Sequence, residues 1–126
     1  MEQQEITNNV KSNLIIELTY QFALSIISFV DELDKLKKYE MARQLFRSGT
    51  SIGANVREAQ SAESTKDFIH KFKIAHKEVL ETKYWIQLCN DSINYPHSTD
   101  LASQINNIDN IIAKIIITNM KKLKDK

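Results

Sequence analysis

The sequence predicts an all-α protein: an up-down-up-down antiparallel four-helix bundle in a single domain. Only two Gly and one Pro occur among 126 residues, which leaves few residues for tight turns. The apolar residues recur at every third or fourth position rather than at every second, which is the helical period. Four amphipathic segments of similar length are joined by short polar stretches, and antiparallel packing at ~20° is the simplest arrangement that buries all four apolar stripes.

The first two helices are expected over residues 13–38 and 39–61. Either Ser12 or Asn13 can serve as the N-cap of the first. Its expected core stripe is Ile15, Leu18, Phe22, Ile26, Phe29, Leu33 and Leu36. The stripe of the second helix is narrower and made of smaller residues, namely Ala42, Leu45, Gly49, Ile52, Val56 and Ala59.

The last two helices are expected over residues 65–90 and 98–123. A Ser-Thr-Lys-Asp run at 64–67 resembles a capping box before the third helix. The fourth helix follows Pro96, with Ser98, Thr99 or Asp100 as its cap. The expected buried residues of the third are Phe68, Phe72, Ala75, Val79, Thr82 and Ile86. Those of the fourth are Leu101, Ile105, Ile108, Ile112, Ile115 and Leu123.

The most informative segment is 43–58, because it places both glycines inside the second helix. Relative to Ala, Gly destabilises a helix by ~1 kcal/mol and Ser or Thr by ~0.5 kcal/mol. Such a run is favourable only where a neighbouring helix needs the space. We therefore assign Gly49, Ser51 and Gly53, and with them Asn55 and Glu58, to helix packing or to an interface.

Composition indicates a soluble cytoplasmic protein. Cys89 is the one cysteine, so an intramolecular disulfide is excluded and a buried, inert thiol is expected. The longest unbroken apolar runs, such as 115–117, are far shorter than the ~20 residues that span a bilayer. The acidic, polar start of the chain does not resemble a signal peptide. We expect no membrane association.

Charge is balanced overall, with 17 basic and 16 acidic residues, but the two signs are unevenly distributed. Residues 1–34 are mainly acidic and residues 35–83 mainly basic. Lines of cations on the outer faces of the second and third helices can follow a phosphate backbone. The candidate nucleic-acid-binding residues are Arg43, Arg47, Arg57, Lys66, His70, Lys73 and Lys77, with Tyr84 as a stacking face. The alternative is an ordinary solvated face, because outer helix faces are normally charged.

Several apolar residues lie away from the expected core stripes. They are Ile16, Tyr20, Ile27, Ile69, Leu80 and Ile117. So many exposed apolar residues favour self-association. An acidic first helix and basic middle helices suit a head-to-tail contact, which closes into a ring when the rotation permits. The alternative is a wide buried stripe with scattered exposed aliphatics.

Four segments carry a family resemblance: YEMARQL (39–45), RSGTSIGANVREA (47–59), DFIHKFKIA (67–75) and KEVLETKYW (77–85). They resemble the bacterial four-helix-bundle family of 23S rRNA intervening-sequence proteins, which includes relatives of the accessory variability protein of diversity-generating retroelements. The resemblance implies a homopentameric ring, a role in binding RNA or DNA, and, in the retroelement branch, a reverse transcriptase partner. It implies no known catalytic activity. The formal charge of +1 departs from the strongly basic retroelement type.

No catalytic residue, cofactor or metal ligand is predicted. Di-iron bundles need inward Glu residues and two Glu-x-x-His motifs, and only Asp67 with His70 approximates one, on the outer face. Gly49 and Gly53 lack the Gly-Lys-Ser/Thr ending of a phosphate loop. Two polar pairs, Asn55 with Glu58 and Glu78 with Glu81, have i,i+3 spacing and can each bridge to an Arg across a helix or subunit interface.

The sequence thus predicts a non-catalytic, ring-forming adaptor that binds RNA or another nucleic acid through the basic faces of the second and third helices. The alternative is a scaffold that binds a protein partner through its exposed aliphatics and never contacts nucleic acid.

Overall fold

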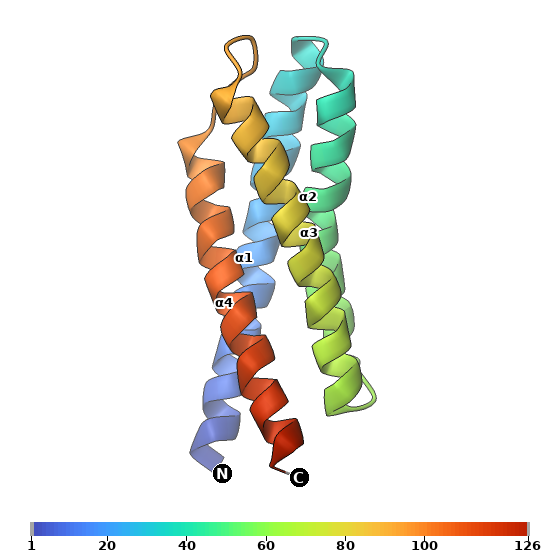
Figure 1. Ribbon diagram of the computed structural model, residues 1–126, viewed down its shortest axis with the longest axis vertical. Helices are drawn as coiled ribbons and strands as arrows, with labels where there is room; N and C mark the ends of the chain where they lie inside the picture. The colour runs from blue at the N-terminus through green and yellow to red at the C-terminus, as the bar shows by residue number, and fades with distance from the viewer. Residues whose placement is uncertain (1, 126) are drawn as a thin grey trace.

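A computed structural model describes the backbone of residues 2–125 and the side chains of residues 13–125. It contains four helices: α1 (Glu2–Lys35), α2 (Tyr39–Ala59), α3 (Thr65–Asp91) and α4 (Thr99–Lys124). Successive helices run antiparallel, and α4 returns to pack against α1, which closes the bundle (Figure 1). The predicted all-α four-helix bundle is therefore confirmed.

Two helix starts follow the predicted capping chemistry. Ser64 Oγ accepts a hydrogen bond from Asp67 N at 3.0 Å, and the Asp67 carboxylate accepts from Glu63 N at 3.3 Å. Ser98 Oγ accepts from Leu101 N at 3.0 Å at the start of α4. Each cap satisfies amide groups that have no partner within the helix.

Other boundaries differ from the prediction. Helix α1 begins at Glu2 rather than at residue 13, so Ser12 and Asn13 lie inside it and not at its start. The segment before them holds no Gly or Pro that would end a helix. At the other end, α1 stops at Lys35 because Lys37 adopts a positive φ of 62°. Likewise, α2 stops at Ala59 rather than at residue 61.

The core confirms most of the predicted stripes. All six predicted residues of α2 are buried, and so are five of the six predicted for α4. Leu36 and Leu123 are exposed instead: Leu36 follows the end of α1, and Leu123 lies where α4 projects past the α2–α3 connection (Figure 1). Thr19 and Ser48, which are polar and not part of the predicted stripes, are also buried.

Cys89 is buried, as expected. Burial raises the pKa of its thiol to about 11, because the charged thiolate is poorly solvated there. The thiol is therefore protonated at neutral pH, which agrees with an inert core residue.

Helices α1 and α2 pack closely against each other at the two glycines. A Cβ atom at Gly49 would lie 2.8 Å from Ile26 Cγ1, and one at Gly53 would lie 3.3 Å from Thr19 Oγ1. Thr19 directs its hydroxyl to the backbone of its own helix, at 2.8 Å from Ile15 O. The prediction that small residues mark a close helix contact is confirmed.

One segment of α1, Asn13–Lys35, is long and apolar enough to cross a membrane by length and composition. The unbroken apolar runs of the sequence do not show this property, because polar residues interrupt the segment. In the bundle it contributes Phe22, Ile26 and Leu33 to the core. A core helix of a bundle and a membrane span share this composition.

A carboxylate on α4 links that helix to α3. Asp109 Oδ2 accepts a hydrogen bond from Lys83 Nζ at 2.5 Å, and Asp109 Oδ1 lies 2.8 Å from His76 Nε2. Burial alone raises the pKa of Asp109, but the hydrogen bonds and charges of Lys83 and His76 outweigh it and hold the pKa below its ordinary 3.8.

Gly49→Ala should destabilise the fold. The better helix propensity of Ala adds ~1 kcal/mol, but overpacking against buried Ile26 costs ~1–3 kcal/mol, so we expect a net loss of about 1 kcal/mol in the free energy of unfolding. Urea unfolding followed by circular dichroism measures it. Gly53→Ala is the matched control and should change stability little, because its Cβ meets a looser contact. A Gly49→Ala protein at least as stable as Gly53→Ala would contradict this packing.

Asp109→Asn should lower the free energy of unfolding at pH 7 by about 1 kcal/mol. Because folding lowers the pKa of Asp109, the stabilisation that its carboxylate provides is present above pH 3.8. This stabilisation is lost as the pH falls through the pKa of Asp109 in the folded protein. The difference in the free energy of unfolding between wild type and variant should therefore shrink as the pH drops below 3.8. Urea titrations at a series of pH values measure it. Asp31→Asn, which removes an exposed carboxylate of α1, is the control and should change the free energy of unfolding at pH 7 little.

Candidate interaction surface

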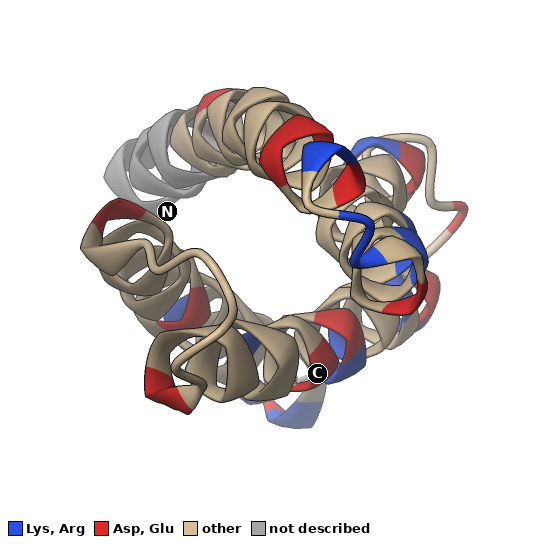
Figure 2. Ribbon diagram, turned by 90° about the horizontal axis from the view of Figure 1, so that it is seen from above, with Lys and Arg blue, Asp and Glu red and all other residues tan. Residues whose placement is uncertain are grey.

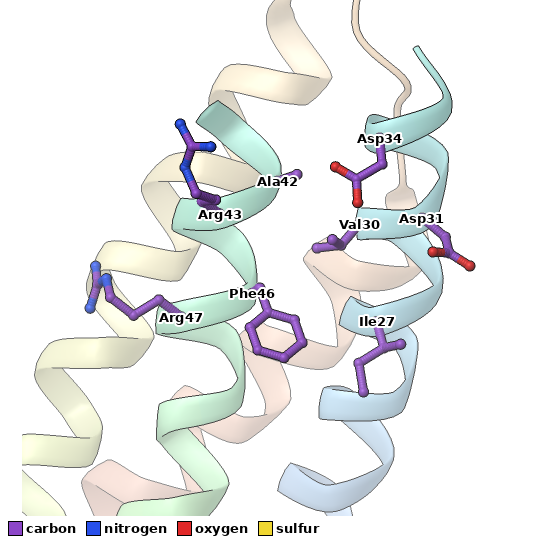
Figure 3. Close-up of a pocket in the computed structure, with 8 residues that line it drawn as sticks. All are labelled: Ile27, Val30, Asp31, Asp34, Ala42, Arg43, Phe46 and Arg47. Carbon is purple, nitrogen blue, oxygen red and sulfur yellow. The ribbon is translucent and has the colours of Figure 1, made fainter. Parts of the chain in front are cut away.

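An apolar groove of ≈ 590 Å³ runs between α1 and α2. Its apolar lining comes from Ile27 and Val30 on α1 and from Ala42 and Phe46 on α2. In Figure 3 the Phe46 ring points across the gap towards Ile27. Ile27 is 45% exposed and Phe46 is 47% exposed, which is high for large apolar residues. A groove of this kind can accept the apolar face of another helix.

The two walls of this groove carry opposite charges. Asp31 and Asp34 line it from α1, while Arg43 and Arg47 line it from α2 and extend away from α1 (Figure 3). Figure 2 shows Lys and Arg gathered around the α1–α2 turn. A docked segment would therefore meet an acidic edge on one side and a basic edge on the other.

The apolar residues predicted to lie off the core divide into two groups. Tyr20, Leu80 and Ile117 are exposed, as Ile27 is, whereas Ile16 is partly buried against the core. Ile69 contradicts the prediction, since only 6% of it is exposed. It lies three residues before Phe72, on the same helical face, so the buried stripe of α3 is wider than expected.

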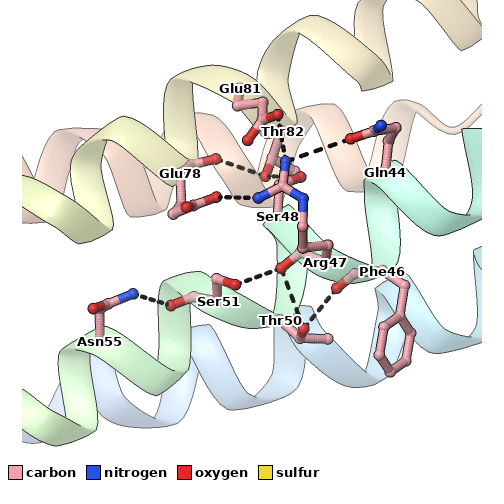
Figure 4. Close-up of polar contacts among 10 residues, drawn as sticks. All are labelled: Gln44, Phe46, Arg47, Ser48, Thr50, Ser51, Asn55, Glu78, Glu81 and Thr82. Atoms are coloured by element: carbon pink, nitrogen blue, oxygen red, sulfur yellow. Dashed lines mark hydrogen bonds and ion pairs between the residues drawn. The ribbon is translucent and has the colours of Figure 1, made fainter.

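Arg47 binds carboxylates of the neighbouring helix. Its Nη1 lies 3.5 Å from Glu78 Oε2, and its Nη2 pairs with Glu81 Oε1 and lies 3.4 Å from Gln44 Oε1 (Figure 4). The prediction that the Glu78 and Glu81 pair bridges to an Arg across a helix interface is confirmed. Partial burial raises the pKa of Glu78, and the positive charge of Arg47 opposes this rise.

A buried polar contact lies beneath this ion pair. Ser48 Oγ and Thr82 Oγ1 share a hydrogen bond of 2.9 Å, which joins α2 to α3 inside the core. Thr82 also donates to the backbone oxygen of Glu78 at 2.7 Å. Ser48 follows Leu45 by three positions on the helix, and this spacing is the signal that could have placed it in the core.

The polar residues of the small-residue segment bond mainly within α2. Ser51 Oγ donates to Arg47 O at 2.5 Å, and Asn55 Nδ2 donates to Ser51 O at 2.9 Å (Figure 4). Glu58 instead pairs with Lys71 of α3, at 3.4 Å. Asn55 and Glu58 therefore do not bridge together to an Arg, unlike Glu78 and Glu81.

The three arginines of α2 do not form a single row. Arg47 reaches towards α3, whereas the Arg57 guanidinium lies 5.4 Å from the centre of the Tyr20 ring on α1. The other predicted nucleic-acid contacts are exposed, and none forms an ion pair with any residue whose side chain the structure describes. They are Arg43, Lys66, His70, Lys73 and Lys77.

Over residues 13–125 no three His, Cys, Asp or Glu side chains are grouped as a metal site would need. His76 is held by Asp109, and His97 Nε2 lies 2.9 Å from Ser92 O. The exposed cations of α2 and α3 and the carboxylates of the groove can form ion pairs and hydrogen bonds with a macromolecule.

Comparisons with known proteins agree with this architecture. A family model described as 23S rRNA-intervening sequence protein matches residues 11–117. A solved structure from Bacteroides thetaiotaomicron, described as a protein of unknown function from the S23 ribosomal protein family, is 36% identical. The alignment covers 90% of this chain and 98% of that one, with a TM-score of 0.66. No curated protein matches the chain.

The family model covers most of the chain, including the glycine contact of α2 and the carboxylates of α3 that hold Arg47. The structural match extends the agreement to the whole bundle. The chain therefore belongs to the family of 23S rRNA-intervening sequence proteins.

Proposed function

We propose that this protein is a non-catalytic adaptor that assembles into a homo-oligomeric ring, with five subunits as the expected number, and binds RNA. The observation that carries the proposal is the exposure of two kinds of surface on one small bundle. One is the apolar groove between α1 and α2, and the other is a set of exposed cations on α2 and α3 that form no ion pair with the side chains of residues 13–125. The family description, which names 23S rRNA, supports RNA as the ligand.

The groove supports a head-to-tail contact between copies. Its acidic wall, formed by Asp31 and Asp34, suits a partner face that combines apolar and basic groups. The C-terminal part of α4 has this character, because Ile117 and Met120 are exposed on the same helical face as the exposed cations Lys121 and Lys124. A contact between two different faces is heterologous and closes into a ring if the rotation permits.

RNA binding should depend on the cations that are free of carboxylate partners. Arg43, Lys66, Lys73 and Lys77 meet this condition, whereas Arg47 is held by Glu78 and Glu81. A ring repeats these cations, and multivalent attachment raises the affinity for one long RNA without new contacts. This compensates for a formal charge of only +1 per chain.

A second candidate is a scaffold that binds a protein partner and no nucleic acid. The groove is the observation that favours it, since an amphipathic helix of another protein has the same complementary features as a second copy. Mass and RNA-binding measurements separate the two candidates.

Light scattering of the purified protein should give a mass five times the 14.6 kDa of one chain. Phe46→Asp buries a charge in the proposed contact and should shift the mass to that of the monomer. Ile93→Asp, at a residue 95% exposed in the α3–α4 connection, is the matched control and should leave the mass unchanged. Circular dichroism verifies that both variants fold. A wild-type monomer at micromolar concentration would exclude the ring.

Binding to RNA should weaken steeply as salt rises, with a slope in log K against log salt set by the number of phosphate contacts. Lys73→Ala and Lys77→Ala should each lower that slope by about 0.7–0.9 per lost contact. Lys71→Ala, which removes a cation of the same helix already paired with Glu58, should lower it less. Gel-shift titrations measure all three. Absence of any association at low salt would favour the protein scaffold.

A further inference from the structure

A second groove, of ≈ 440 Å³, lies at one end of the bundle. It is formed where the first turns of α2 meet the C-terminal half of α3 and the α3–α4 connection. The α1–α2 turn and the α3–α4 connection lie at this same end (Figure 1). The residues that line the groove are Glu40, Met41, Arg43, Gln44, Trp85 and Tyr95.

Aromatic rings and cations are interleaved around this groove. The Tyr84 and Trp85 ring centres are 5.3 Å apart at an interplanar angle of 56°, and Tyr84 is 56% exposed. Lys38 Nζ lies 4.7 Å from the centre of the Tyr95 ring. Neither Lys38 nor Arg43 forms an ion pair with a residue whose side chain is described. The groove therefore holds two rings, Trp85 and Tyr95, with Arg43 in its wall and Lys38 on the Tyr95 ring.

The groove also offers hydrogen-bonding groups of both kinds. The Glu40 carboxylate can accept from an exocyclic amino group, and the Gln44 amide, although it accepts from Arg47 at 3.4 Å, keeps its own NH₂ donor. Its volume lies within the ~300–1,000 Å³ typical of sites for small ligands. A flat, polar-edged aromatic group fits this chemistry.

Nucleobases in a duplex are stacked on each other, so their faces cannot reach a protein ring. Unpaired bases can stack on Tyr or Trp, and cations beside the rings then hold the flanking phosphates. The groove matches this requirement, because Trp85 and Tyr95 line it together with Arg43, and Lys38 lies on the Tyr95 ring.

We infer that this groove binds an unpaired nucleobase of single-stranded RNA, stacked against its aromatic rings, with Lys38 and Arg43 on the neighbouring phosphates. The inference rests on the RNA binding proposed above and adds which part of the RNA is recognised. A peptide rich in proline also docks on aromatic grooves, but it gains nothing from the two unpaired cations.

Trp85 is the one tryptophan of the chain, so its intrinsic fluorescence reports on this groove without labelling. The full-length protein is titrated with a single-stranded RNA and with a duplex RNA of equal length. Single-stranded RNA should quench the fluorescence and bind at least tenfold tighter than the duplex. Tyr95→Leu should weaken single-strand binding by about 5- to 100-fold, the range for one lost base–aromatic stack, and leave duplex binding unchanged.

Two variants serve as controls for the aromatic ring of Tyr95 and for its position. Tyr95→Phe keeps the ring and should retain most of the affinity for single-stranded RNA. Tyr20→Leu removes an exposed tyrosine of α1 outside the groove and should have no effect. Circular dichroism checks the fold of each variant.

The outcomes distinguish this inference from the function on which it rests. Equal affinity for both RNAs with unchanged Trp85 fluorescence would overturn the base-binding groove and leave the RNA adaptor standing. Failure to bind either RNA at low salt would overturn both. Quenching by a proline-rich peptide, with no response to single-stranded RNA, would assign the groove to a protein partner and also overturn the inference.

Discussion

The close approach of α1 and α2 at Gly49 is the contact on which the rest of the bundle depends. Ile26 fills the space that a side chain at Gly49 would occupy, and Thr19 does the same opposite Gly53. Because Ile26 points inward at this contact, its neighbour Ile27 is turned by ~100° towards the outside. Phe46 follows the buried Leu45 by one position and is likewise turned towards the outside. The apolar groove is therefore a geometric consequence of how the two helices pack.

The face of α2 that packs against α3 is held by polar contacts. There a buried hydrogen bond between Ser48 and Thr82 lies beneath the ion pairs of Arg47 with Glu78 and Glu81. Apolar packing has no directional preference, whereas these bonds hold only in one register. The same contacts engage Arg47 and so remove one cation from the surface available to a polyanion. Packing between helices thus shapes the electrostatics of the outer face.

Arg43 connects the two grooves, because it lines both the apolar groove beside α1 and the aromatic groove at the bundle end. A second copy docked in the first groove would lie within reach of the residue that we assign to RNA phosphate. Assembly and RNA binding would then share one side chain. In a ring, each subunit would present this shared edge in the same orientation.

The amino-acid sequence by itself determined the helical class, the bundle, the small-residue contact of α2 and the caps at Ser64 and Ser98, because periodicity, helix propensity and capping are local properties. The carboxylate pair on α3 was also visible as an i,i+3 spacing. Only the tertiary structure decided which neighbour each side chain meets. It turned Arg47 towards α3 and Arg57 towards Tyr20, buried Ile69, and left Leu36 in solvent. It also brought Tyr95 to Lys38 and Trp85 to Arg43. Such pairings depend on the rotation and offset of whole helices, which no single segment of the chain contains.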